Sequence, residues 1–268
     1  MATGALRLNE TAALCCGRDG VTDSQHGSPV LPNYRNAKAQ KFLLDAVLRS
    51  VVMLDELLKH WEPYRNLPAP PAKAIQLWVK DSRIIYIDDR SGPAVPYPAI
   101  DRHDGSRNHG YVRLKENFRT IGKVPEVQGW PELQKFLETV NAPDSPIERL
   151  GCEKCYFPLE GRGAAKVSLG SYVDVAFSDT TVTEKPENFL RLAVPLVNAV
   201  EGCERSWGQV ELGLQPLRYF FGSTTAWNLL IRVTNQGRTE EEARRFWGES
   251  IRRMGDAIAK LPANFPCR

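Results

Sequence analysis

The chain has 268 residues, a net charge of +3, a hydrophobic fraction of 42% and a charged fraction of 25%. This composition is typical of a soluble globular protein and excludes a disordered chain, which has too few apolar residues to offset the entropy of ordering. Apolar stretches reach about five residues, whereas a membrane helix needs roughly 20, so the sequence predicts no membrane span. The 35 basic and 32 acidic residues are interleaved, which argues against the clustered basic face that nucleic-acid binding requires.

The first part of the chain, residues 1–34, is polar and punctuated by glycine, serine and proline. This composition predicts a tail. Arg7 and Glu10 interrupt the stretch that would be the apolar region of a signal peptide. We therefore expect no secretion signal, a cytoplasmic location and reduced thiols.

The next region, 35–145, is predicted to be a helix-and-hairpin subdomain. From 36 to 61, apolar residues recur at spacings of three and four, which predicts a long amphipathic helix that packs one stripe on the core. Two β-rich runs, 74–79 and 83–87, surround a short turn and predict a hairpin. The segment 89–128 has no regular pattern.

Beyond the irregular segment, the sequence predicts a short helix and then a connection. Pro131 is a favoured first helical residue, and apolar side chains up to Val140 recur at helical spacing. Residues 143–163 are rich in turn-forming residues. They predict a linker and favour a boundary between two subdomains.

The last region, 164–268, is predicted to be a βαββα subdomain. Alternating apolar residues over 165–178 predict a strand, a helix begins at Pro186, and two more strands follow. Thr239, with Glu242 at the capping-box position, begins the final helix. This order of elements predicts the α+β class, with an antiparallel sheet that carries its helices on one face.

The segment that contains Asp101, His103 and His109 is the best enzymatic candidate of the sequence. Histidines beside carboxylates can bind a divalent metal or relay protons, and Asp88 and Asp89 at the end of the predicted hairpin add two more ligands. The alternative hypothesis is therefore a metal-assisted hydrolase, a phosphoesterase or a nuclease. The same residues also suit a polar surface loop, since they include common turn sequences.

Cys152 and Cys155 form the one cysteine pair with the spacing of a metal or redox site. Structural zinc needs four ligands, and no second pair is near in the sequence. A thioredoxin-like pair would lie between a strand and a helix, whereas the predicted linker surrounds this one. We therefore expect no metal and no cofactor.

Gly170, Ser171 and Asp174 are similar to the Gly-Ser and metal-binding aspartate of nucleotidyltransferases. That chemistry needs a second carboxylate two residues further on, and Ala176 stands there. The sequence therefore predicts that Asp174 is an outward-facing strand residue.

The run Val167-Ser-Leu-Gly-Ser-Tyr-Val173, the predicted helix after it and Trp207-Gly-Gln-Val210 resemble immunity proteins of bacterial polymorphic-toxin systems. Those proteins are small, cytoplasmic and α+β, and each binds and blocks one toxin. The resemblance implies a binding role and transfers no functional residue to this chain.

The lack of a complete catalytic motif and the aromatic, strand-rich body favour a non-enzymatic protein that binds another protein, such as a toxin or an effector. The predicted contact surface is the hairpin with Trp78 and Tyr86, together with Asp88, Asp89 and Arg102 of the segment after it. The sequence predicts no membrane or nucleic-acid partner and leaves the oligomeric state open.

Overall fold

The computed structural model describes residues 34–65, 74–88, 92–101, 103, 107–160, 163–203, 208–223 and 226–266. The predicted tail, apart from Tyr34, lies outside these residues. The chain divides into two compact units, Met1–Leu43 and Leu44–Arg268. The sheet, the helices on it and the candidate site all belong to the second unit.

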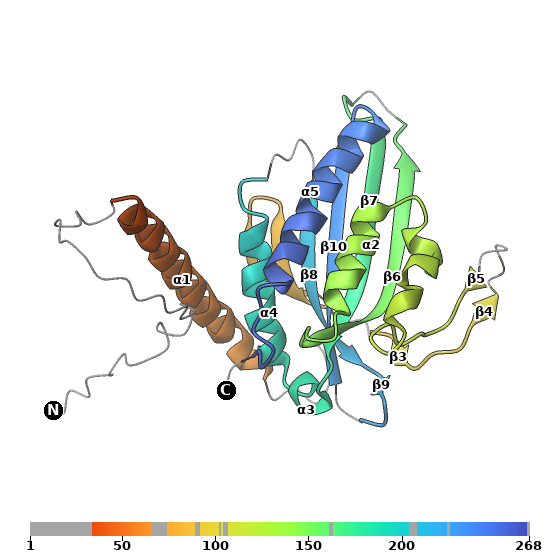
Figure 1. The fold of residues 1–268 in the computed structure, drawn as a ribbon, viewed down its shortest axis with the longest axis horizontal. Coiled ribbons are helices and arrows are strands. Elements are labelled where there is room, and N and C mark those ends of the chain that lie inside the picture. The colour runs from red at the N-terminus through yellow and green to blue at the C-terminus, as the bar shows by residue number, and fades with distance from the viewer. Residues whose placement is uncertain are drawn as a thin grey trace, which may run out of the picture. The chain divides into compact units, whose positions relative to one another are not determined.

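The second unit is built on a six-stranded sheet with the strand order β1-β2-β8-β10-β7-β6 (Figure 1). Neighbouring strands are antiparallel, except for β2 and β8, which are parallel. The predicted α+β class is therefore confirmed, and the sheet is mainly antiparallel with one parallel pair. The strands are β1 (Ile75–Lys80), β2 (Arg83–Ile87), β6 (Ile147–Pro158), β7 (Val167–Phe177), β8 (Gln209–Leu217) and β10 (Ala226–Gly237).

Three helices, α2, α4 and α5, lie across one face of this sheet (Figure 1). Trp247 of α5 is completely buried there, and its indole Nε1 donates a hydrogen bond of 3.0 Å to the Ser171 hydroxyl on β7. Thr239 caps α5 by accepting a bond of 3.1 Å from the Glu242 amide, as the capping box predicted. The helices are α1 (Tyr34–Trp61), α2 (Pro131–Val140), α3 (Thr180–Thr183), α4 (Pro186–Ala199) and α5 (Glu240–Ile258).

The end of α1 packs on the core, whereas the apolar side chains from Leu44 to Val52 that the structure describes are exposed, and Ser50 contacts α4 by accepting a hydrogen bond of 3.0 Å from Asn198. Leu57 and Trp61 are buried, but Val47 and Val51, which belong to the predicted inner stripe, are 57% and 51% exposed. The prediction that the whole stripe packs on the core is therefore wrong for this part of the helix. No described helix is long and apolar enough to cross a membrane.

The segment predicted as a linker, 143–163, instead contains the twelve-residue edge strand β6. Its register on β7 shifts between Arg149 and Gly151, where a bulge interrupts the alternation of side chains. Glu148 is completely buried in this strand, which no period-two pattern would predict. Its carboxylate accepts two hydrogen bonds, of 2.8 and 2.9 Å, from the Arg113 guanidinium. Arg113, 35 residues away in the sequence, therefore allows the Glu148 carboxylate to be buried in this strand.

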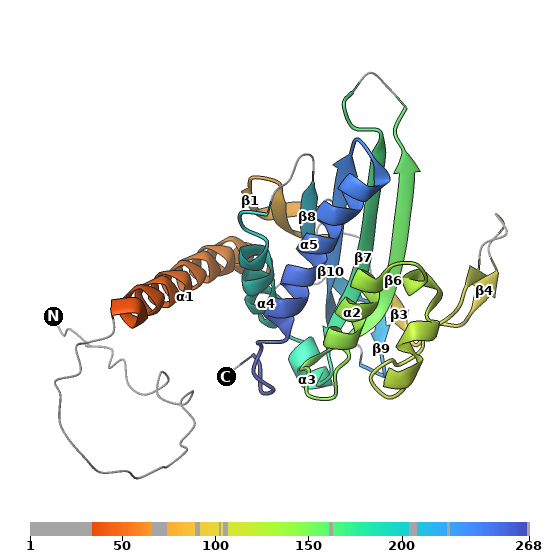
Figure 2. The ribbon, with the colours of Figure 1, turned by 45° about the horizontal axis from the view of Figure 1, so that its top comes forward.

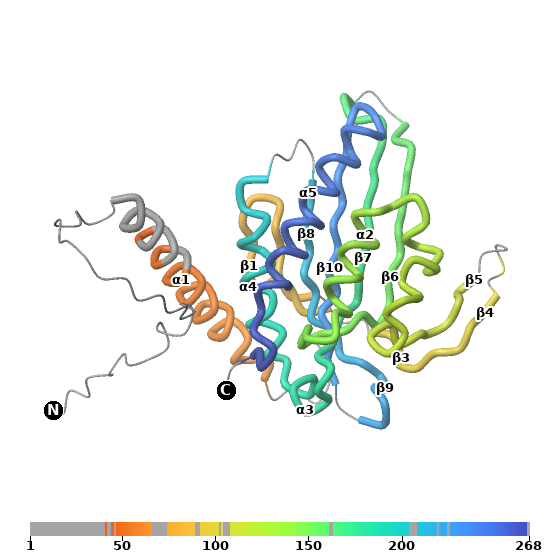
Figure 3. The backbone as a smooth tube through the Cα atoms, viewed as in Figure 1, coloured from red at the N-terminus to blue at the C-terminus, as the bar shows by residue number. Residues whose placement is uncertain are grey.

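The segment 93–126, which precedes α2, lies against the β6 edge of the sheet and against the face opposite to the three helices (Figures 2 and 3). A second apolar cluster there joins Val95 to Leu150, Ala176, Leu217 and Phe220. The segment has little regular structure, as predicted, and its short elements hold it in place. They are β3 (Ala94–Val95), which pairs with β9 (Tyr219–Phe220), β4 (Ile100–Asp101), β5 (Arg107–Asn108), and the 3-10 helices Phe118–Lys123 and Pro125–Val127.

Gly237 marks the closest approach of β10 to the start of α5, and this gives the first prediction. A Cβ on Gly237 would lie 2.5 Å from the Ala243 amide nitrogen and 2.7 Å from the Thr239 carbonyl oxygen. Both are backbone atoms, so α5 itself would have to move. We expect Gly237→Ala to lower the free energy of unfolding by about 1–3 kcal/mol in urea denaturation. Gly163→Ala is the control, because nothing lies within 4 Å of its Cβ position; equal effects would contradict this interpretation.

Candidate ligand-binding cavity

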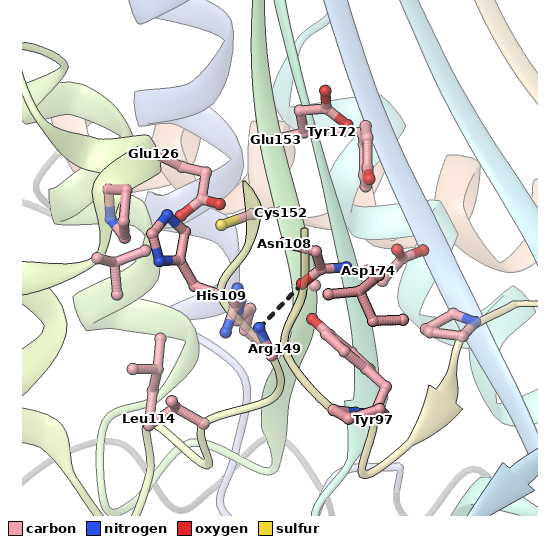
Figure 4. A pocket seen from close by; sticks show the side chains of 18 of the residues that line it. Tyr97, Asn108, His109, Leu114, Glu126, Arg149, Cys152, Glu153, Tyr172 and Asp174 are labelled. Atoms are coloured by element: carbon pink, nitrogen blue, oxygen red, sulfur yellow. Dashed lines mark hydrogen bonds between the residues drawn. The ribbon is translucent and has the colours of Figure 1, made fainter. Parts of the chain in front are cut away.

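A cavity of about 790 Å³ lies between β6, β7 and the segment 93–126 (Figure 4). We call it the edge cavity, because β6 is the last strand of the sheet. Its volume is within the range of known ligand sites. The lining residues that carry its chemistry are Tyr97, His109, Glu126, Arg149, Cys152 and Asp174.

Arg149 is a buried cation without an ion-pair partner. Its side chain is 5% exposed, and its Nε has no hydrogen-bond partner in the described part of the chain. No described carboxylate lies within 4.0 Å of the guanidinium. Burial works against the charge, but Cys152, Tyr97 and Glu126 hold the pKa of Arg149 above its usual value. The guanidinium therefore stays charged, and its N–H groups can donate further hydrogen bonds to a ligand in the cavity.

Two acidic groups that are not carboxylates, the Cys152 thiol and the Tyr97 phenol, also act on Arg149. Neither of them neutralises its charge. Burial raises the pKa of Cys152 to about 11, against the opposing effect of Arg149. Burial also raises the pKa of Tyr97, whose hydroxyl donates a bond of 3.2 Å to the Leu150 carbonyl. Both groups are protonated at neutral pH, so the charge of the guanidinium is balanced only by carboxylates that lie beyond ion-pair distance, such as Glu126 and Asp174.

Asp174 begins a row of buried polar side chains that crosses four strands. Asn228 on β10 donates a bond of 2.8 Å to Asp174 Oδ1 and one of 3.3 Å to Gln215 Oε1. Gln215 on β8 in turn donates a bond of 3.0 Å to Asp88 Oδ2, just after β2. Burial raises the pKa of Asp174 to about 7, although Asn228, Arg149 and Arg232 favour its charged form. Asp174 lies on the face away from the helices but is only 7% exposed, so the outward-facing residue of the prediction is in fact buried.

The charges around the edge cavity depend on the protonation of Asp174. Lys123 and Arg218 line it as further cations, and Glu126 and Glu153 line it as anions. With Asp174 protonated, the lining therefore has three cations, including Arg149, and two carboxylates. This balance favours a ligand with a negative group placed against Arg149.

The residues of the predicted hydrolase cluster do not gather in one place. His109 lines the edge cavity, whereas Asp101 and His103 are exposed and are not among its lining residues. Asp88 lies in the polar row, and Asp89 lies outside the described residues. In the part of the chain that the structure describes, no three His, Cys, Asp or Glu side chains are placed to hold a metal ion.

The predicted contact surface is largely covered. Tyr86 is 8% exposed, and its ring lies so close to Gly213 that a Cβ there would be 2.8 Å from the ring. Trp78 is half-buried, with the guanidinium of Arg83 5.4 Å from its ring centre. Asp88 is 1% exposed, and Arg102 lies outside the described residues. The hairpin therefore presents little of these aromatic side chains to a partner.

The two cysteines of the predicted pair are both free thiols on β6. Cys152 pairs with Val173 and is buried, and it lines the edge cavity. Cys155 pairs with Gly170 and lies against it, with Sγ 3.2 Å from the position of a Gly170 Cβ. The Cys152 thiol thus lies at the cavity, and the Cys155 thiol lies against Gly170.

Sequence patterns did not indicate the edge cavity, because Arg149 lies in a segment that resembled a linker. One signal was available: two charged residues, Glu148 and Arg149, stand between the apolar residues Ile147 and Leu150, and charged residues that a strand buries are usually paired. Comparison with known proteins adds no relative. No family model matches the chain, and no curated protein and no solved structure matches it either.

Proposed function

We propose that this chain is a non-enzymatic binding protein whose edge cavity receives a carboxylate of another protein. The observation that carries the proposal is the buried guanidinium of Arg149, which has no carboxylate of its own chain within 4.0 Å in the described residues. Arginine presents a planar fork of donors that matches a carboxylate with two parallel hydrogen bonds. Such a bond is strongest where water is excluded, as it is around a side chain that is 5% exposed.

Binding fits the chemistry of the cavity better than catalysis does. The one thiol among the described residues that line it, Cys152, has a pKa of about 11 and is therefore a poor nucleophile at neutral pH. Of the residues of the hydrolase hypothesis that the structure describes, only His109 lines the cavity. The resemblance to immunity proteins supports a toxin as the protein that supplies the carboxylate. The free thiols Cys152, Cys155 and Cys203 support a cytoplasmic location within this proposal.

A displayed library of random decapeptides, together with two small competitors, tests this function. We expect the selected peptides to compete with glutarate but not with glutaramide, which lacks the charge. Removal of the guanidinium in Arg149→Met should weaken peptide binding at least 30-fold, because truncating one partner of a buried charged pair costs about 2 kcal/mol or more.

Arg218→Met is the matched control, because Arg218 also lines the edge cavity but is exposed. We expect it to change affinity by less than about threefold, as is usual for a charge at the rim. The proposal fails if Arg149→Met binds the selected peptides as tightly as the wild type, or if glutarate does not compete.

A further inference from the structure

Among the described residues, hydrogen bonds from other segments to the outward backbone groups of β6 are confined to its first four residues; further along, the 3-10 helix Pro125–Val127 lies beside the strand, and the Lys154 side chain donates a bond of 2.6 Å to the Gln128 carbonyl. Lys115 Nζ donates to the Ile147 carbonyl, 3.2 Å, and the Arg149 amide donates to Asn141 Oδ1, 3.1 Å. The Tyr97 hydroxyl donates to the Leu150 carbonyl. Beyond Leu150, no other described strand pairs with this edge.

The direction of the free backbone groups follows from the pairing with β7. The Leu159 amide donates to the Lys166 carbonyl, 2.8 Å, so Leu159 is a hydrogen-bonded partner of β7. In an antiparallel ladder such residues alternate with residues whose N–H and C=O groups point away from the pair. Lys154 and Tyr156 therefore present their backbone groups outward, and Pro158, which has no N–H, ends this row.

Two large side chains accompany this unpaired edge. Tyr156 is 47% exposed and Phe157 is 56% exposed, and as neighbours on a strand they point to opposite faces of the sheet. An edge strand with exposed aromatic residues is a template for pairing with another chain. An added strand would place its alternate side chains against these two rings.

The free edge leads directly into the edge cavity. Glu153 lies between the two regions, on the strand next to Lys154 and in the lining of the cavity. From Tyr156 back to Arg149 the strand spans about 23 Å at the usual rise per residue. A chain that paired along this edge could not continue past Leu150, where Tyr97 and Asn141 already occupy the backbone groups.

We propose that the partner segment is an extended carboxy-terminal tail that adds to β6 as an antiparallel strand and ends at Arg149. An antiparallel addition runs from Tyr156 towards Arg149, so the terminal carboxylate arrives where the edge is blocked and the guanidinium is unpaired. This mode combines strand addition with capture of a carboxyl terminus. It rests on the proposed function, since it names the segment that brings the carboxylate into the edge cavity.

The test uses decapeptides with free carboxyl termini, selected from a displayed library on the wild-type protein. We expect amidation of the terminus to weaken binding at least tenfold. Tyr156→Pro removes the ring and one outward N–H, whereas Tyr156→Thr removes the ring but keeps that N–H; the proline variant should therefore bind about tenfold more weakly than the threonine variant. The backbone N–H of Tyr156 points away from β7, so its loss in the proline variant should leave the hydrogen bonds between β6 and β7 in place.

Amide hydrogen exchange gives a second readout that needs no variant. The amides of Lys154 and Tyr156 should exchange rapidly in the free protein and become protected when the peptide is added, while the already bonded Arg149 amide should change little.

Failure of this inference and failure of the proposed function are distinguishable. If Arg149→Met abolishes binding but amidation, Tyr156→Pro and exchange have no effect, the carboxylate comes from a side chain and strand addition is wrong. If Arg149→Met has no effect on peptide binding, both the tail and the carboxylate site are wrong.

Discussion

The free energy of unfolding is expected to fall by about 3 kcal/mol between pH 4 and pH 7 through Asp174 alone. Burial raises the pKa of this carboxyl from 3.8 to about 7, and one pKa unit corresponds to about 1.4 kcal/mol. Between these two values the folded state holds the proton and the unfolded state releases it. Stability due to this group is therefore complete below about pH 4 and is lost as the pH rises through 7.

The measurement is urea denaturation of the wild type and Asp174→Asn at several pH values, since other carboxyls titrate in the same range. Asparagine keeps an oxygen that can accept the hydrogen bond from Asn228 but carries no charge. The two proteins should be about equally stable near pH 4, and the variant should be the more stable at pH 8. A difference that stays constant with pH would show that the carboxyl of Asp174 titrates normally.

Arg149→Met is expected to raise the free energy of unfolding by about 2–4 kcal/mol at pH 7, although it should abolish ligand binding. The guanidinium is buried without a carboxylate within 4.0 Å in the described residues, and Cys152 and Tyr97, which favour its charge when ionised, are protonated at this pH. The desolvation of such a charge costs several kcal/mol. Methionine fills a similar volume without that cost. Opposite effects on stability and binding are the mark of a residue kept for function.

Arg218→Met is again the control, and its exposed side chain should leave stability within about 0.5 kcal/mol of the wild type. Urea denaturation without any ligand measures both variants. A loss of more than 1 kcal/mol in Arg149→Met would mean that the guanidinium supports the fold itself, and the argument for a ligand would fail.

Local patterns were sufficient for most of the framework of this fold. The helix from Pro131 and the helix capped by Thr239 follow from spacing and capping residues, which act within a few positions of each other. The strand β7 follows from its alternating apolar residues in the same way. These elements depend on neighbours in the sequence, so the sequence alone contains their signal.

The edge strand and the cavity beside it depend instead on contacts between distant residues. Glu148 can be buried only because Arg113 reaches it from another segment, and no local pattern contains that pair. The pKa of Asp174 likewise depends on burial and on Asn228, 54 residues away. The candidate site could not be predicted, because each of its key groups acquires its chemistry only from the assembled sheet.

The bulge in β6 brings Arg149 and Cys152 to the same face of the strand. On a regular strand, residues three positions apart point to opposite faces, yet Arg149 and Cys152 both line this cavity because one extra residue shifts the phase between them. The number of residues between Arg149 and Cys152 is thus as strongly constrained as their identity. A single insertion or deletion there would place Arg149 and Cys152 on opposite faces of the strand, and conservative substitutions elsewhere could not restore their arrangement.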